Sequence, residues 1–295
     1  MYKFHYIDAF TTRPFAGNPC AVFPQADGLS DQLMQDIAME TNLSETSFVF
    51  TTEAADFKVR YFTPRYEIPF AGHPTIATAY HLARSGMIAL SGTRTVVQFE
   101  FNIGVLPVEI IQDHDGDVAM VGMQQKAPVF GETVDPAVLA EHLNLSQDAC
   151  FPGVPAQSVS TGVPFLIVPL RTLDAVKQAE MNRTEIRRIL EELSVDALFV
   201  CTPNGFTKDG DTFARLMDPG NAGEDPYTGS ATGCLGSFFY RYGIVRKQQM
   251  VCEQGHLLGR PGSGRIEIMG SPEDIEGVKL FGTAVESMSG VCDPQ

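Results

Sequence analysis

The sequence predicts an α+β fold made of two similar lobes, and three observations lead to this prediction. Many short β-branched or aromatic segments are bounded by Gly, Pro, Asn or Asp, as β-strands are. Helical patterns are fewer, and they do not alternate regularly with the strands, which favours α+β over α/β. An internal repeat contains the pattern of a buried helix in each of its two copies.

The expected strands are distributed along the whole chain, and each spans five to eight residues. They are residues 2–9, 46–51, 57–62, 95–101, 104–111, 118–123, 165–169, 197–202, 212–217, 265–269 and 278–285.

Three amphipathic helices are expected outside the repeat. Ser30 precedes an apolar rhythm that includes Met34 and Ile37, as an N-cap residue does. Residues 135–143 and 184–193 show the same rhythm and also open on a plausible cap.

The repeat aligns residues 67–88 (EIPFAGHPTIATAYHLARSGMI) with residues 224–245 (EDPYTGSATGCLGSFFYRYGIV) without a gap, at an offset of 157 positions. Six positions are identical, more than the one or two expected by chance at roughly average composition. They are Glu67/Glu224, Pro69/Pro226, Gly72/Gly229, Thr75/Thr232, Arg84/Arg241 and Gly86/Gly243. The repeat predicts a first lobe of residues 1–117 plus 278–295 and a second lobe of residues 118–277.

Each copy predicts one helix. In the first copy His73 is the expected N-cap and Pro74 the first helical residue; in the second, Ser230 and Ala231 take these places. A glycine follows each helix, and neither carries a charged residue before the arginine of its last turn. A helix that is apolar nearly all round is buried, so each lobe should enclose its helix.

The first amides of a helix need partners, and the positive end of its dipole favours an anion. We therefore expect an anion to bind between the two helix N-termini, at the amides near Gly72 and Gly229. Asn18, in the AGNP segment, is a further candidate substrate contact.

Composition excludes several classes of protein. The formal net charge of −15 argues against a nucleic-acid or anionic-membrane partner, and no apolar stretch reaches 18 residues. No signal peptide is evident and the six cysteines are scattered, so we expect free thiols and a cytoplasmic location. The sequence lacks a P-loop, HExxH and GxGxxG, and no ligand spacing indicates a metal site.

Each candidate side chain also has a simpler interpretation. Asn18 and Asp225 could be turn residues, and Glu45 a solvated carboxylate. His73 could be a structural histidine, and Ser230 only a helix cap. The repeat favours a function for His73 and Ser230 because it puts them at matching helix N-termini.

Five segments, in order along nearly the whole chain, resemble the phenazine-biosynthesis isomerase (PhzF-like) family. They are IDAFTTRPFAGNPCAVF (residues 7–23), NLSETSFV (42–49), FTPRYEIPFAGHPTIA (62–77), EDPYTGSATGCLG (224–236) and QGHLLGRPG (254–262). The resemblance implies a diaminopimelate-epimerase-like fold. In this fold two pseudo-symmetric lobes each have a mostly antiparallel sheet wrapped around a central helix.

The resemblance also implies an activity. The family's phenazine enzyme moves a proton on a dihydro-hydroxyanthranilate, and the glutamate that shuttles the proton corresponds to Glu45. His73, Asp225 and Ser230 correspond to residues that assist and position the substrate. The family uses no cofactor and no metal, and its members are commonly homodimers.

Epimerases and racemases of the same fold use two cysteines at the helix N-termini as acid and base. The corresponding positions here are Ala71 and Thr228, which cannot exchange a proton in this chemistry. Cys234 lies inside the second helix and is expected in the core. A single carboxylate favours an allylic isomerisation, while a non-catalytic carboxylate-binding protein and an epimerase or racemase remain the alternatives.

Overall fold

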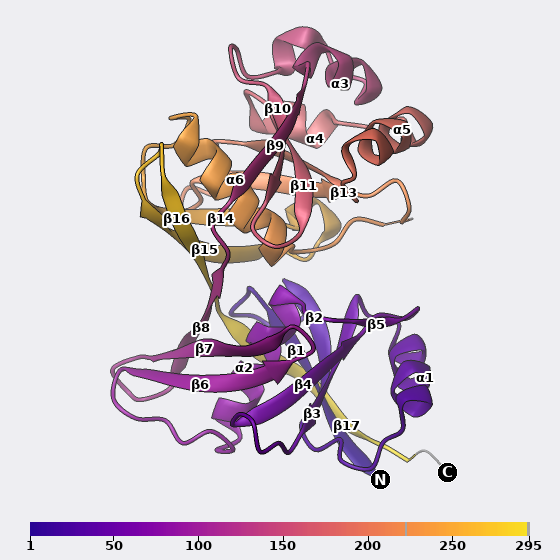
Figure 1. Cartoon of the computed structure of the whole chain (residues 1–295), viewed down its shortest axis with the longest axis vertical. Helices are drawn as coiled ribbons and strands as arrows, with labels where there is room; N and C mark the ends of the chain where they lie inside the picture. The colour runs from indigo at the N-terminus through magenta and orange to yellow at the C-terminus, as the bar shows by residue number, and fades with distance from the viewer. Residues whose placement is uncertain (222, 294–295) are drawn as a thin grey trace. The chain divides into compact units, whose positions relative to one another are not determined.

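The computed structural model of the chain describes residues 1–221 and 223–293. The chain divides into two compact units: unit 1 is Met1–Gln124 with Phe281–Gln295, and unit 2 is Gln125–Leu280. Each unit has its own sheet and its own enclosed helix (Figure 1).

Unit 1 has the strand order β17–β1–β2–β3–β4–β6–β7–β8, and a short strand, β5, also pairs with β4. The bounds are β1 Tyr2–Ala9, β2 Asn18–Phe23, β3 Glu45–Phe50, β4 Phe57–Phe62, β5 Glu67–Ile68, β6 Arg94–Phe101, β7 Gly104–Gln112, β8 Val118–Gln125 and β17 Ala284–Cys292.

Unit 2 has the strand order β9–β10–β11–β12–β13–β14–β15. The bounds are β9 Val129–Val134, β10 Ala156–Ser160, β11 Pro164–Pro169, β12 Leu198–Thr202, β13 Thr212–Met217, β14 Gln249–Gln254 and β15 Gly262–Gly270, and β16 follows at Ile275–Gly282.

The seven strands of unit 2 follow the same order as the seven strands from β17 to β7 of unit 1. Most pairs are antiparallel, and the parallel pairs recur at matching places: β2 with β3 and β4 with β6 in unit 1, β11 with β12 and β13 with β14 in unit 2. Parallel neighbours need a crossover, and each of these four crossovers contains a helix. The expected α+β fold, with a mostly antiparallel sheet and a central helix in each lobe, is confirmed.

The central helices are α2 (Gly72–Arg84) and α6 (Gly229–Arg241), and in each of them ten of the thirteen residues are buried. Helix α2 packs against β1, β2, β3, β7 and β17, and α6 packs against β10, β11, β12 and β15. At Gly236 of α6 an added Cβ would come within 1.8 Å of Ile266 Cδ1, so this residue lets the helix approach its sheet closely.

Both central helices begin two residues earlier than the sequence indicates. The N-cap of α2 is Ala71 rather than His73, and that of α6 is Thr228 rather than Ser230. Pro74 is therefore the third helical residue, which the helix tolerates because first-turn amides have no partner within the helix. The predicted N-caps were wrong because they assumed a side chain that accepts a hydrogen bond from the first turn. The methyl group of Ala71 cannot accept one.

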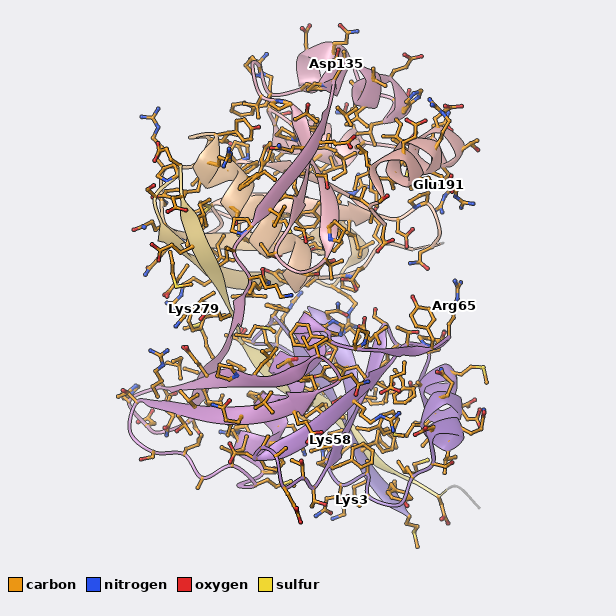
Figure 2. All side chains as sticks on the ribbon, viewed as in Figure 1. Lys3, Lys58, Arg65, Asp135, Glu191 and Lys279 are labelled. Atoms are coloured by element: carbon orange, nitrogen blue, oxygen red, sulfur yellow. The ribbon has the colours of Figure 1, made fainter. Side chains whose placement is uncertain are left out.

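The other helices cover the outer face of each sheet. In unit 1, α1 (Asp31–Thr41) is capped by Ser30, as expected, and packs its buried side chains on β3 and β4. In unit 2, Asp135 caps α3 (Pro136–His142) (Figure 2), and α5 (Arg183–Leu193) is capped by Asn182. Helix α4 (Leu173–Gln178) was not expected, and two 3-10 turns lie at Gln147–Ala149 and His256–Leu258.

Candidate active site

Three of the expected site residues of unit 1 lie together. Asn18 begins β2, Glu45 begins β3, and His73 is in the first turn of α2. His73 Nδ1 is 3.3 Å from Asn18 Nδ2, and His73 Nε2 is 3.3 Å from Glu45 Oε2. The imidazole ring therefore lies between an amide and a carboxyl group, each within reach of one ring nitrogen.

The parallel pairing of β2 and β3 brings these residues together. Cys20 of β2 is paired with Glu45 of β3, so both strands begin at the same edge of the sheet. Glu45 keeps 19% of its side chain exposed, whereas Asn18 is fully buried. Glu45 thus has the more exposed side chain of these two residues.

Burial determines the charge of His73. The residue is 6% exposed, and its burial lowers the pKa to about 3, although the Pro19 carbonyl opposes this shift. The imidazole is therefore neutral at neutral pH, and its 3.3 Å contact with Glu45 is a close approach of a neutral ring to a carboxyl group rather than an ion pair. A neutral ring can exchange a proton with a neighbouring carboxyl group or orient it.

The loop that leads into Asn18 has an unusual backbone. Phe10, Phe15 and Gly17 all have positive φ, and at Gly17 (φ 57°) an added Cβ would lie 2.1 Å from Ala9 O. Asp8, which is 1% exposed, accepts a hydrogen bond of 2.7 Å from the Phe15 amide. Left-handed backbone in non-glycine residues is costly and often concentrates near functional sites.

Unit 2 has its own polar cluster at the start of α6. Asp225 Oδ2 accepts a hydrogen bond of 2.6 Å from Thr228 Oγ1. Gln254, which is 2% exposed, accepts from the Thr228 amide at 2.9 Å and donates to the Asp225 carbonyl at 2.8 Å. Gly229 and Ser230 follow as the first two residues of the helix. Sequence reasoning missed Gln254, although it opens the QGHLLGRPG segment.

The repeated glutamates have a structural role that the sequence did not reveal. In unit 1, Arg60 binds Glu67 through Nε (2.8 Å) and Nη2 (2.7 Å). In unit 2, Arg215 binds Glu224 through Nε (3.2 Å) and Nη2 (2.5 Å). Each pair ties the strand before the central helix to the segment that leads into that helix.

The starts of α2 and α6 leave their first amides available. Within the described part of the chain, no side chain caps either helix. The Thr228 hydroxyl, which could cap α6, donates to Asp225 instead. Each unit therefore offers a helix N-terminus with the properties that favour an anion.

The thiols near these sites are poor acid–base groups. Cys20 and Cys234 are fully buried, as expected for Cys234, and burial raises the pKa of Cys234 to about 11. Burial also raises the pKa of Cys20, and the Glu45 charge adds to this effect. A thiol with a raised pKa is an inert side chain at neutral pH.

The two repeated sheets, each around a buried helix, define the diaminopimelate-epimerase-like class of folds. Residues 7–290 match the family model described as phenazine biosynthesis-like protein, and the chain belongs to this family. The chain is 33% identical to the Bacillus subtilis (strain 168) protein named uncharacterized isomerase YfhB, over 95% of this chain and 94% of that one. It is 32% identical to the uncharacterized isomerase CA_C3446 of Clostridium acetobutylicum, over 96% and 95%. The chain is an isomerase of this family.

Solved structures lead to the same family. The PhzF-family phenazine biosynthesis protein of Bacillus anthracis superposes with a TM-score of 0.88 at 28% identity, over 98% of both chains. A probable proline racemase from Agrobacterium radiobacter K84 superposes with a TM-score of 0.67 at 11% identity, over 100% of this chain and 94% of that one, and so shares the fold. Among the described residues, no helix combines the length and apolar character needed to span a membrane.

Proposed function

We propose that this isomerase moves a proton on a small unsaturated carboxylate of the dihydro-hydroxyanthranilate type, without a cofactor, and that Glu45 is its acid and base. The observation that carries the proposal is the contact of the partly exposed Glu45 carboxyl group with the buried, neutral His73. A carboxylate on a partly exposed side chain can remove a proton and return it.

The chemistry balances without a redox step. Glu45 removes a proton from a C–H bond next to the unsaturated system, and the electron pair shifts along the allylic system towards the carboxylate end. The same carboxyl group then returns the proton to another carbon, so a double bond changes position. Developing negative charge is stabilised by oriented amide groups, which a helix N-terminus provides.

The remaining site residues are proposed to bind and orient the substrate. His73 and Asn18 hold the Glu45 carboxyl group in one orientation, as their contacts in unit 1 support. Asp225 and Ser230 are proposed as further substrate contacts, and the amides at Gly72 and Gly229 as donors to the substrate carboxylate. We further propose that the protein is cytoplasmic and that it forms a homodimer. Light scattering of the purified protein tests the homodimer.

The first alternative is a protein that binds a small carboxylate without turning it over. Dihydroaromatic carboxylates are incubated with the protein in deuterated water, and C–H exchange is followed by NMR. Exchange supports the isomerase, whereas saturable binding without exchange would contradict it.

Glu45→Gln should lower the exchange rate at equal substrate occupancy by at least about 10²-fold, the typical contribution of a general acid–base group. The matched control is Glu40→Gln, the same change at an exposed position of unit 1. Unchanged exchange in Glu45→Gln, together with a clear loss in Cys234→Ala, would replace the carboxylate with a thiol and favour the epimerase or racemase alternative.

A further inference from the structure

We propose that His5, His81 and Glu286 of unit 1 form a binding site for one divalent transition-metal ion of the zinc class. The three residues lie on β1, α2 and β17, and each offers one ligand atom. These ligand atoms all lie within 4.8 Å of one another. The site goes beyond the isomerase activity, since it uses none of the residues assigned to catalysis or substrate binding.

The pairing of β1 with β17 positions two of the ligands. Ile7 is paired with Glu286, and His5 is two residues before Ile7 on the same strand. Alternate residues of a strand share a face, so His5 and Glu286 are diagonal neighbours on one face of the sheet. Ile7 is fully buried, and both strands pack against α2, so this face carries the third ligand, His81.

The distances between the ligand atoms are compatible with a shared metal ion, although His5 and Glu286 are hydrogen-bonded without one. His5 Nδ1 is 3.1 Å from Glu286 Oε1, and His81 Nδ1 is 3.8 Å from Glu286 Oε2. Tetrahedral ligands that are each about 2.0–2.1 Å from zinc are separated by about 3.3 Å. The two distances run to different oxygens of Glu286, and each lies within about 0.5 Å of this value. Small rotations of the three side chains therefore suffice to bind the ion.

The imidazole rings of His5 and His81 lie close together. Their centroids are 4.0 Å apart, and both Nδ1 atoms face the same carboxylate. Two imidazoles and one carboxylate form a donor set that suits zinc, and three protein ligands leave a position for water.

Spacing along the chain could not reveal this site, because 281 positions separate His5 from Glu286. The second cluster of possible ligands, Asp113, His114 and Asp115, lies within one turn and is fully exposed. Asp113 Oδ1 already accepts hydrogen bonds from the amides of Asp115 and Asp117. This loop therefore serves as the internal control rather than as a second site.

The test is zinc binding by the full-length protein without an affinity tag. After removal of metal with EDTA, Zn²⁺ alone is titrated by calorimetry, and bound zinc is measured after gel filtration. We expect one Zn²⁺ per chain, and a melting temperature that rises with zinc concentration. His5→Gln and Glu286→Gln should each weaken binding by more than the roughly 10- to 100-fold that loss of an outer-shell partner costs.

Three further measurements separate zinc binding at this site from unfolding and from zinc binding elsewhere on the chain. His114→Gln should bind zinc as the unaltered protein does, and so should Glu45→Gln, which separates this proposal from the proposed activity. Circular dichroism of each metal-free variant shows whether it is folded, and bound Co²⁺ should give the visible absorption of a tetrahedral site only when His5 and Glu286 are present. The proposal is wrong if the unaltered protein binds no zinc, if folded His5→Gln and Glu286→Gln bind it normally, or if only His114→Gln loses it.

Discussion

His73 is uncharged although the Glu45 carboxyl group lies 3.3 Å from its Nε2 atom. Desolvation outweighs the attraction that would otherwise favour the imidazolium ion. The sequence identified Asn18, Glu45 and His73 through separate segments that match family motifs. It could not show that one ring lies between the other two groups, because that contact depends on the pairing of β2 with β3.

The low pKa of His73 predicts a particular loss of stability in acid. The unfolded chain takes up a proton on this histidine below about pH 6.5, but the folded chain does so only near pH 3. Stability therefore falls as the pH decreases through this window, by about 1.4 kcal/mol per pH unit from this residue. Urea unfolding of His73→Gln at pH 6.5 and pH 5 should show about 2 kcal/mol less pH dependence than the unaltered protein.

His114→Gln is the matched control, because that side chain is 88% exposed. It should keep the pH dependence of the unaltered protein. Equal pH dependence in the unaltered protein and His73→Gln would mean that His73 is not buried as a neutral ring.

At the scale of single elements, the loop before β2 and the segments before the central helices determine where the site residues lie. The sequence predicted the long strands closely, and Tyr2–Ala9, Phe57–Phe62 and Thr212–Met217 have the expected bounds. It missed β2, β5, β9, β10 and β14. Pro19 weakens the strand pattern in β2, and glutamines weaken it in β14. It joined β16 and β17 into one strand because the apolar pattern continues across the break at Thr283.

Gly17→Ala should disturb the site through the backbone. The new Cβ would overlap Ala9 O, so the loop and the adjacent Asn18 must shift. Gly92→Ala is the control, because Gly92 has a similar φ of 67° but open space around its Cβ position. We expect Gly92→Ala to cost about 1–2 kcal/mol in the free energy of unfolding, and Gly17→Ala to cost more and also to slow substrate exchange.

Calorimetric unfolding and the NMR exchange assay measure these two effects. An equal loss of stability in both variants, with normal exchange in Gly17→Ala, would contradict a role for this loop in positioning Asn18.

Arg215→Gln tests the segment that leads into α6. Arg215, with 14% of its side chain exposed, also donates to the carbonyls of Val176 (2.7 Å) and Ala179 (2.9 Å). Its removal leaves these carbonyls and Glu224 without their donor and should cost about 1–3 kcal/mol in denaturant unfolding. Arg188→Gln, which breaks the exposed pair with Glu192, should cost about 0.5 kcal/mol or less. Equal costs would show that Arg215 acts only as a surface charge.

For the whole molecule, the repeat was the most informative signal in the sequence. It predicted two helices, and the structure extends the correspondence to seven strands in each sheet. Helix α2 ends before Gly86 (φ 77°) and α6 before Gly243 (φ 64°), at positions that correspond in the repeat. Corresponding strands of the two units are too different in sequence for this correspondence to be recognised. Many different apolar residues can occupy the same position in a sheet.

Deletion of residues 281–295 should destabilise unit 1 selectively. Strand β17 pairs with β1 along its whole length, from Tyr2 opposite Cys292 to Ala9 opposite Ala284 (Figure 1). Without it, β1 has an exposed edge, and one side of α2 loses its cover. Limited proteolysis should release fragments of unit 1 before fragments of unit 2, while deletion of residues 293–295 should have little effect. A resistant unit 1 in the longer deletion would show that β17 is dispensable.

The pairing of β17 with β1 also affects how the protein is made. A ribosome produces Tyr2–Ala9 long before Ala284–Cys292. Unit 2, which is continuous in sequence, can complete its sheet while the first unit still lacks a strand. Domains usually fold in the order of their synthesis, but here the domain that begins first finishes last. Until β17 has emerged from the ribosome, the open edge of β1 is a place where chaperones can bind and where newly made chains can pair wrongly.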